Sequence, residues 1–182
     1  MSKAIGMAEY QTVSTGIEAA DLMIKTADVD VIEAQTVCPG KYIIIITGEL
    51  SAVKASVDAT RARFGEKLID SFVLGNPDES IFPAIYATNE IKNKSALGVL
   101  ETFSAATMIV AGDVAAKTAE VELIEMRLAR GMCGKSYMLI TGEVAAVAAA
   151  IEKAKVAAGD KGMFLDSSII ANPDDKLWET IL

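Results

Sequence analysis

An internal repeat constrains the fold of this chain more than any other feature of its sequence. Ala4-Ile5-Gly6-Met7-Ala8-Glu9 reappears 92 residues later as Ala96-Leu97-Gly98-Val99-Leu100-Glu101. Over residues 4–34 this offset gives 13 identities in 31 pairs. A chain that contains two such copies is expected to build one structural unit twice. The 182 residues therefore predict two similar small domains.

The offset between the copies grows along the chain. Gly40-Lys41 pairs with Gly134-Lys135 at an offset of 94, because the second copy has two more residues near this point. Asn76-Pro77 pairs with Asn172-Pro173 at an offset of 96. Polar residues separate the copies and indicate a linker. The repeat predicts domain 1 over residues 3–88, a linker over residues 89–94 and domain 2 over residues 95–182.

Each copy has the hydrophobic pattern of alternating strands and helices. A strand over residues 4–11 is followed by a helix, and the spacing predicts that its buried apolar face contains Val13, Ile17, Ala20, Ile24 and Ala27. Thr15 and Glu18 have the spacing of a capping box in this helix. The pattern predicts a chain with both helices and strands, α/β in the broad sense and α+β more specifically. Each copy is expected to form a βαββαβ antiparallel sheet layer with helices on one face and a short C-terminal helix.

A hairpin and a second helix follow in each copy. The hairpin is predicted over residues 29–47, with its turn at Cys38-Pro39-Gly40. The buried face of the next helix is predicted to contain Val53, Val57, Thr60 and Phe64 in the first copy and Val144, Val147, Ile151, Ala154 and Ala158 in the second. Ala-rich helices of this kind permit close packing, so we expect the protein to form oligomers.

Charge and composition argue against several functional classes. The net charge of -8 and the pI near 4.6 argue against a nucleic-acid partner, which usually demands a basic face. The longest strongly apolar run, residues 42–46, is far shorter than the roughly 18 residues of a membrane span. The first residues lack the long apolar region of a secretory signal, so we expect a cytoplasmic protein without a membrane partner. The absence of histidine removes Ser-His-Asp and Cys-His catalysis.

Cys38 is the residue with the most specific chemistry. It stands on a Pro-Gly turn between two apolar runs, in the stretch Val37-Cys38-Pro39-Gly40-Lys41. In an isolated chain it would be a buried apolar residue or an inert turn residue, whereas copies brought together by symmetry could ligate a metal. Cys133 aligns with Pro39 rather than with Cys38. It is either a small residue in a Gly-rich turn or a secondary metal ligand.

Three motifs occur in both copies and carry a family resemblance. They are A-(I/L)-G-(M/V)-x-E at residues 4–9 and 96–101, D-x-(M/A)-x-K-T-A-x-V at residues 21–29 and 113–121, and T-G-E-(L/V)-x-A-V at residues 47–53 and 141–147. With these motifs the chain resembles bacterial microcompartment (BMC) shell domains over essentially its whole length. The tandem arrangement and the Cys38 turn resemble the T-type tandem shell proteins of propanediol-utilisation compartments.

The resemblance implies a structural protein rather than an enzyme. BMC domains form hexagonal tiles that pack edge to edge into a polyhedral shell, and a tandem protein makes such a tile as a homotrimer, a pseudohexamer. The resemblance implies a pore loop that comprises Pro39, Gly40, Gly131, Met132 and Gly134. It implies that Cys38 from three chains binds one [4Fe-4S] cluster per trimer on the threefold axis. The implied task is electron transfer across the shell, with other BMC shell proteins and encapsulated redox enzymes as partners.

The resemblance also implies residues at the edge of the tile. Lys25 and Lys117 match the tile-edge lysine of the family. Asn76 and Asn172 stand where many members have an arginine before proline, so the edge contact differs there.

Two other functions compete with the cluster-binding tile. One is a metal-free shell tile with metabolite pores. The other is a ligand-binding or catalytic α/β module that shares only the repeat architecture, although the sequence has no P-loop or G-x-G-x-x-G signature to support it.

Overall fold

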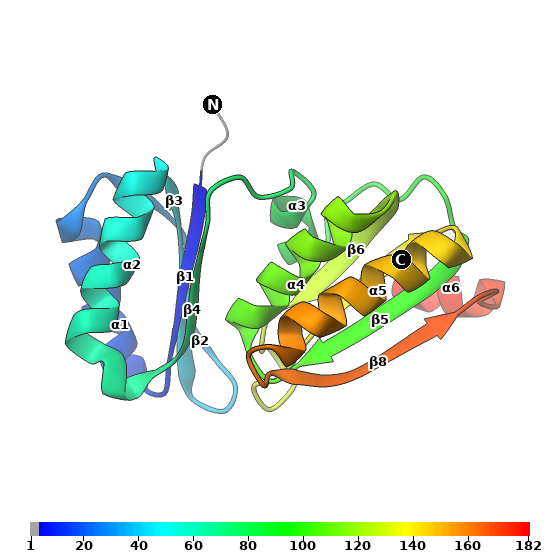
Figure 1. The fold of residues 1–182 in the computed structure, drawn as a ribbon. Helices are drawn as coiled ribbons and strands as arrows, with labels where there is room; N and C mark the ends of the chain where they lie inside the picture. The colour runs from blue at the N-terminus through cyan, green and yellow to red at the C-terminus, as the bar shows by residue number, and fades with distance from the viewer. Residues whose placement is uncertain (1–3) are drawn as a thin grey trace. The chain divides into compact units, whose positions relative to one another are not determined.

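The protein is described by a computed structural model that covers residues 4–182, so the predicted start of domain 1 at residue 3 lies outside the described residues. The chain divides into two compact units, each with its own four-stranded sheet (Figure 1). Unit 1 contains the described residues up to Pro77 together with Ser104–Thr107 and Ala129–Gly134. Unit 2 contains Asp78–Phe103, Met108–Leu128 and Lys135–Leu182.

The first copy of the repeat builds the sheet of unit 1. Its elements are β1 (Ala4–Tyr10), α1 (Val13–Thr26), β2 (Val29–Val37), β3 (Lys41–Gly48), α2 (Leu50–Phe64), a short 3-10 helix (Gly65–Lys67) and β4 (Leu68–Leu74). The strand order is β2-β3-β1-β4, and every neighbouring pair is antiparallel. Helices α1 and α2 lie beside each other along this sheet (Figure 1).

The second copy builds the sheet of unit 2 in the same order. Its elements are β5 (Ala96–Thr102), α4 (Ala105–Thr118), β6 (Val121–Arg127), β7 (Ser136–Gly142), α5 (Val144–Gly159), β8 (Phe164–Ile170) and α6 (Asp175–Ile181). The strand order β6-β7-β5-β8 is again antiparallel throughout. The predicted α+β class, with the βαββαβ order in both copies, is confirmed.

The strand registers show which residues of the two copies are structurally equivalent. Glu9 of β1 lies opposite Asp70 of β4, and Glu101 of β5 lies opposite Asp166 of β8. On their other sides, Glu9 lies opposite Ile43 and Glu101 opposite Tyr137. Structural equivalence therefore follows the offsets of 92, 94 and 96 seen in the sequence.

The buried face predicted for α1 is confirmed at Ala20 but wrong at Ile17 and Ile24. Ile17 and Ile24 are 55% and 53% exposed, whereas the buried residues of this helix are Thr15, Gly16, Ala19, Ala20 and Met23. The small residues face inward because the backbone comes very close to the sheet there: a methyl group at Gly16 would lie 2.3 Å from Cβ of Tyr42. The helix also begins at Val13, so the N-cap is Thr12 and the predicted capping box of Thr15 and Glu18 does not form.

The second helix of each copy packs largely as predicted. Val53, Val57 and Thr60 are buried in α2, while Phe64 is partly buried. In α5, Val147, Ile151, Ala154 and Ala158 are buried as expected, but Val144 in its first turn is 44% exposed.

Short helices and the linker complete unit 2. Helix α3 (Ile81–Ile85) packs on β6, and Trp178 of α6 packs against Leu97 and Ile124. Residues 88–95 form neither helix nor strand. The Asn89 side chain nevertheless donates to the Leu123 carbonyl at 2.8 Å, which anchors this segment within unit 2.

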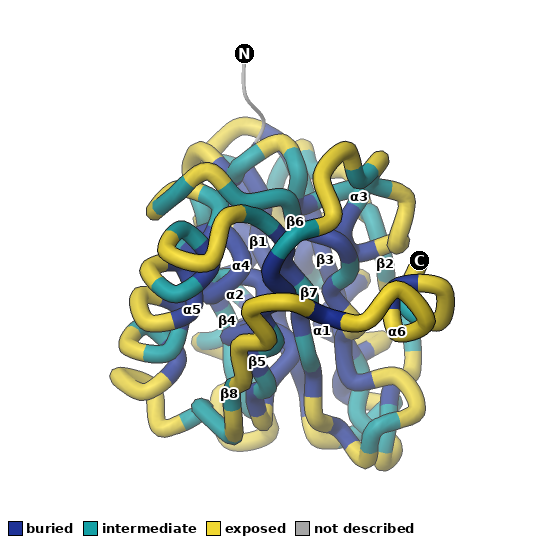
Figure 2. The backbone as a smooth tube through the Cα atoms, turned by 90° about the vertical axis from the view of Figure 1, so that its right-hand side faces the viewer, coloured by how far each residue is buried: buried dark blue, intermediate teal, exposed yellow. Residues whose placement is uncertain are grey.

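Among the strands, burial is concentrated in the central ones and is lowest in β8 (Figure 2). Every residue of β1 is buried, whereas Ile169 and Ile170 of β8 are 41% and 38% exposed. Across residues 4–182, no helix combines the length and the apolar character that crossing a membrane requires.

Candidate functional site

Cys38 is partly buried at the tip of the β2–β3 hairpin. The turn closes with a hydrogen bond of 2.9 Å from the Gly40 N–H to the Val37 carbonyl, and the Cys38–Pro39 peptide bond is cis. Gly40 has a φ of 104°, in the left-handed region that favours glycine. The turn therefore holds the thiol at the end of the hairpin rather than in the core.

The segment Ala129–Gly134 lies against the Cys38 turn within unit 1. The Cys38 N–H donates to the Ala129 carbonyl at 3.1 Å. A methyl group at Gly134 would lie 2.9 Å from the Cys38 carbonyl oxygen, so the two backbones are in close contact. The pore-loop residues of both copies that the sequence singled out are therefore neighbours here.

A shallow depression exposes this part of unit 1. It is lined by Thr36, Val37, Cys38, Pro39, Gly40, Arg130 and Gly131. The Arg130 guanidinium lies 3.6 Å from Oε1 of Glu33. Burial raises the pKa of the Glu33 carboxyl above its usual range, an effect that Arg130 and Gln35 partly offset. The positively charged Arg130 and the Cys38 thiol thus line the same depression.

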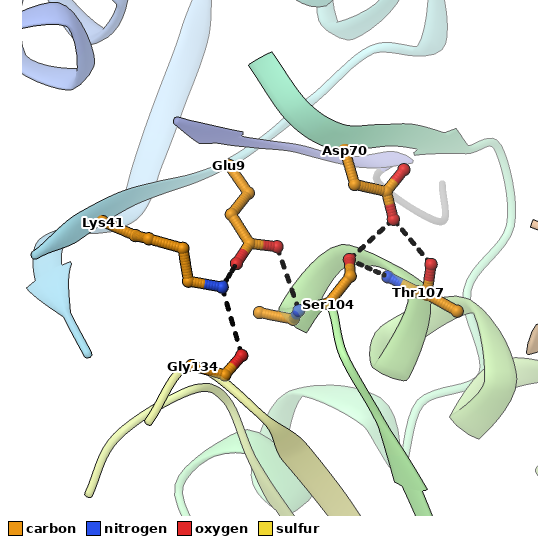
Figure 3. A network of polar contacts seen from close by, with 7 residues as sticks. Glu9, Lys41, Asp70, Ser104, Thr107 and Gly134 are labelled. Atoms are coloured by element: carbon orange, nitrogen blue, oxygen red, sulfur yellow. Dashed lines mark hydrogen bonds and ion pairs between the residues drawn. The ribbon is translucent and has the colours of Figure 1, made fainter. Parts of the chain in front are cut away.

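A buried ion pair connects the base of the Cys38 turn to Gly134 (Figure 3). The Lys41 ammonium donates to Oε1 of Glu9 and, at 3.1 Å, to the Gly134 carbonyl. The other Glu9 oxygen accepts the Ala105 N–H at 3.0 Å. Glu9 is fully buried, so these contacts compensate a charge that would otherwise be very costly inside the protein.

Asp70 makes a second set of contacts beside the first (Figure 3). Its Oδ2 accepts hydrogen bonds of 2.6 Å from both the Ser104 and the Thr107 hydroxyl. The Ser104 Oγ in turn accepts the Thr107 N–H at 3.1 Å and so caps the N-terminus of α4. Two carboxylates therefore lie at the N-terminus of one helix, where the helix dipole favours negative charge.

The chemistry of the donor set decides how a metal could fit. Iron-sulfur clusters are held by cysteine thiolates, and Cys38 offers one partly accessible thiol. Within residues 4–182, no group of three or more His, Cys, Asp or Glu residues could hold a metal ion. Cys38 therefore fits a cluster only as one ligand of a site that several chains share.

The remaining predicted pore-loop residues lie on the second hairpin tip. Cys133 is exposed, with a φ of 52°, and Met132 is partly buried. Gly131 and Gly134 have φ values of 72° and 85° and so provide the turns of this segment.

The predicted tile-edge residues lie away from the Cys38 turn in the sequence and are mostly exposed. Lys25 donates to Asp21 at 2.6 Å, and Lys117 donates to Asp113 at 2.7 Å. Asn76 and Asn172 are exposed, whereas the prolines that follow them are buried.

The chain matches the family model for the BMC domain twice, over residues 4–77 and 96–173. It belongs to the BMC family. The members are structural shell proteins of bacterial microcompartments rather than enzymes, and they assemble as oligomers with other shell proteins. The chain is thus a tandem BMC shell protein, and the resemblance seen in the sequence is confirmed. The catalytic-module hypothesis is not supported.

Individual relatives agree with this assignment. The bacterial microcompartment shell protein PduT of Citrobacter freundii is 36% identical over 182 residues, which cover 100% of this chain and 99% of that protein. A crystal structure of a microcompartment protein from Desulfitobacterium hafniense DCB superposes with a TM-score of 0.87 at 41% identity, covering 98% and 99% of the two chains. The fused permuted shell protein MSM0275 of the RMM microcompartment shares the fold, with a TM-score of 0.67 at 22% identity over 87% and 82% of the chains.

The sequence analysis did not identify the contacts that Glu9, Lys41 and Asp70 make. A usable signal was present, because all three residues are identical in the second copy, as Glu101, Lys135 and Asp166.

Proposed function

We propose that this tandem BMC protein forms a homotrimer, a pseudohexameric tile in which the Cys38 turns of three chains meet on the threefold axis. The proposal rests on the family membership and on the position of Cys38 at a partly exposed hairpin tip. It includes domain boundaries at residues 3–88 and 95–182, with residues 89–94 as the linker.

The proposed trimer binds one [4Fe-4S] cluster through the three Cys38 thiolates. The observation that carries this proposal is the accessible Cys38 thiol in a chain that, over residues 4–182, has no complete metal site of its own. Three symmetry-related thiolates can bind three of the four irons, which leaves the iron on the axis with a ligand from outside the protein. Alternatively, Cys133 is a secondary candidate for a further protein ligand to the cluster.

This chain's own residues would hold the thiolates in place and moderate their charge. The bond from the Cys38 N–H to Ala129 fixes the turn, and the Arg130 guanidinium is a positive group in the same depression. Nearby positive charge stabilises thiolates. When bound, the cluster would supply one-electron chemistry, so we propose electron transfer across the shell, with encapsulated redox enzymes as partners.

A metal-free tile with metabolite pores is the second candidate function. The backbone-rich tip formed by Gly40, Gly131 and Gly134 supports it, because glycines leave amide groups accessible to a passing solute. In this case Cys38 would be an inert turn residue.

Oxygen-free purification distinguishes the two candidates. We expect about four irons and four sulfides per trimer and a broad absorbance near about 400 nm. Replacing Cys38 by Ser should abolish iron, sulfide and absorbance, while Cys133→Ser should retain them as the matched control. A wild-type trimer without iron, or a Cys38→Ser trimer with a full complement of iron, would refute the cluster proposal.

A further inference from the structure

In unit 1, two acidic residues and one lysine from the first copy of the repeat bind residues from the second copy. Glu9 and Asp70 bind the first turn of α4 through the Ala105 N–H and the hydroxyls of Ser104 and Thr107. Lys41 binds the Gly134 carbonyl at 3.1 Å. We call Glu9, Asp70 and Lys41 the first triad.

The second copy contains the same three residue types, but within the described part of the chain their side chains have no helix N-terminus and no carbonyl bound to them. Glu101 and Asp166 are equivalent to Glu9 and Asp70, as shown by the matching registers of β1 with β4 and of β5 with β8. Lys135 matches Lys41 at the sequence offset of 94. Asp166 and Lys135 are exposed, and Glu101 is partly buried. Among residues 4–182, the side chains of Glu101 and Lys135 make no hydrogen bond or ion pair, and the Asp166 carboxylate accepts only from the adjacent Ser167 N–H.

The first copy contains the complementary surface, also without its counterpart. Thr12, Val13 and Thr15 at the start of α1 are the equivalents of Ser104, Ala105 and Thr107. The Thr12 and Thr15 hydroxyls lie 3.0 Å apart, and the first turn of α1 contains no acidic residue. A carboxylate placed there would find two hydroxyls and the positive end of a helix dipole.

The tip of the Cys38 turn shows the same difference between the copies. A methyl group at Gly134 would collide with Lys41, whereas a methyl group at the equivalent Gly40 would have no atom within 4 Å. Lys41 therefore occupies the space beside Gly134, whereas the equivalent space beside Gly40 is open.

We propose that Glu101, Asp166 and Lys135 of one chain bind the α1 N-terminus and the Gly40 carbonyl of a second copy of this chain. This inference rests on the proposed trimer and assigns the residues of its chain-to-chain contact. Asp166 accepts from the Thr12 and Thr15 hydroxyls of the second copy, and Glu101 accepts from its Val13 N–H. Lys135 pairs with Glu101 and donates to the Gly40 carbonyl, two residues from Cys38.

A second copy is the occupant that the observations favour. The donors and acceptors on the two surfaces are the equivalents, one by one, of pairs that are already bonded inside unit 1. The two surfaces lie on different copies of the repeat, so the contact joins chains head to tail, and three such contacts would close the proposed trimer. Each Cys38 turn would then receive one lysine from a neighbouring chain.

Sedimentation of aerobically prepared, cluster-free protein tests this proposal by measuring the trimer dissociation constant. Asp166→Asn and Lys135→Gln should each weaken the trimer about ten-fold or more, since each removes a charged hydrogen-bonding group from the contact. Asp160→Asn and Lys153→Gln remove the same charges from other exposed positions and should leave the constant unchanged. Because the altered side chains are exposed in the single chain, circular dichroism should show an intact fold.

A double-mutant cycle tests the contact itself. Thr15→Val should weaken the trimer as Asp166→Asn does. The dissociation constant of the double variant should be close to that of the single variant with the weaker trimer, because both changes remove the same hydrogen bond. Additive effects, or unchanged dissociation in the single variants, would overturn the inference while a wild-type trimer would stand. A wild-type protein that stays monomeric would instead refute the proposed trimer.

Discussion

Glu33 and Glu125 show how a single neighbour changes a buried carboxylate. Both residues are partly buried at equivalent positions of β2 and β6. Glu125 accepts from the Tyr137 hydroxyl at 2.7 Å and from Arg127 at 3.0 Å. In the first copy Ile43 stands in place of Tyr137, and among the described residues Oε2 of Glu33 has no hydrogen-bond partner. The pKa of Glu33 is raised, mainly by burial.

The raised pKa predicts a pH-dependent gain from Glu33→Gln. A carboxyl whose folded pKa lies above its unfolded value contributes stability at low pH and loses that contribution as pH rises through the folded pKa. Glutamine carries no charge at any pH. The variant should therefore melt at a higher temperature than the wild type at pH 7, and the difference should shrink as pH falls toward about 4.

The matched change at Glu125 should have the opposite sign. Glu125→Gln weakens two charge-assisted hydrogen bonds, from Tyr137 and from Arg127, and should lower the melting temperature at pH 7. Thermal unfolding followed by circular dichroism at both pH values measures both variants. A difference between Glu33→Gln and wild type that stays constant with pH would contradict the assigned titration.

At the scale of elements, helix-on-sheet packing depends on glycines in the central strands. A methyl group at Gly6 in β1 would lie 2.6 Å from Val53 of α2. At the equivalent Gly98 in β5 it would lie 2.7 Å from Val147 and 2.9 Å from Ile151 of α5. The helices therefore approach the sheet more closely than any residue with a side chain would permit.

Gly98→Ala should destabilise the protein by about 1 to 3 kcal/mol, because the added methyl must displace packed valine and isoleucine side chains. Gly159→Ala is the control, since a methyl there would have no atom within 4 Å. Urea denaturation at one fixed protein concentration compares the two variants. Equal midpoints for both would show that α5 can move away from β5 at no cost.

At the scale of the whole molecule, two proposed sets of residues contact other chains. One set would join chains within the trimer, and the other would join neighbouring tiles at their edges. Lys25 and Lys117 belong to the second set. They form ion pairs with Asp21 and Asp113, and the side chains of Lys25 and Asp21 are 72% and 61% exposed. An exposed ion pair such as Lys25–Asp21 adds little stability to a fold, so Lys25 can exchange it for another contact at little cost. The Lys117 side chain is 43% exposed, although its partner Asp113 is buried.

Replacing both Lys25 and Lys117 by Ala should therefore separate tiling from trimer formation. We expect the concentration needed for sheet formation, seen by electron microscopy, to rise at least about ten-fold, because each lost ammonium removes a charged donor. The trimer should persist in sedimentation. Replacement of Lys54 and Lys153, which are exposed on α2 and α5, should affect neither property. Loss of the trimer in the first variant would contradict the assignment of these lysines to the tile edge.

Much of the fold was predictable because it depends on local patterns. Turn residues and apolar periodicity located the hairpins, and the repeat extended each assignment to the second copy. The face of α1 was not predictable in this way. Ile17 and Ile24 match an apolar helix face, but the close approach of Gly16 to Tyr42 turns the small residues inward and leaves both isoleucines exposed.

The sequence by itself determined that one unit is built twice, that each copy is an α+β layer, and that Cys38 stands on a turn, because these properties depend on residues close together in the chain. The tertiary structure alone decided which polar residues meet. Glu9 bonds to Ala105, 96 residues away, and Lys41 to Gly134, 93 residues away. Contacts at such separations depend on how whole elements pack, and no local pattern encodes them.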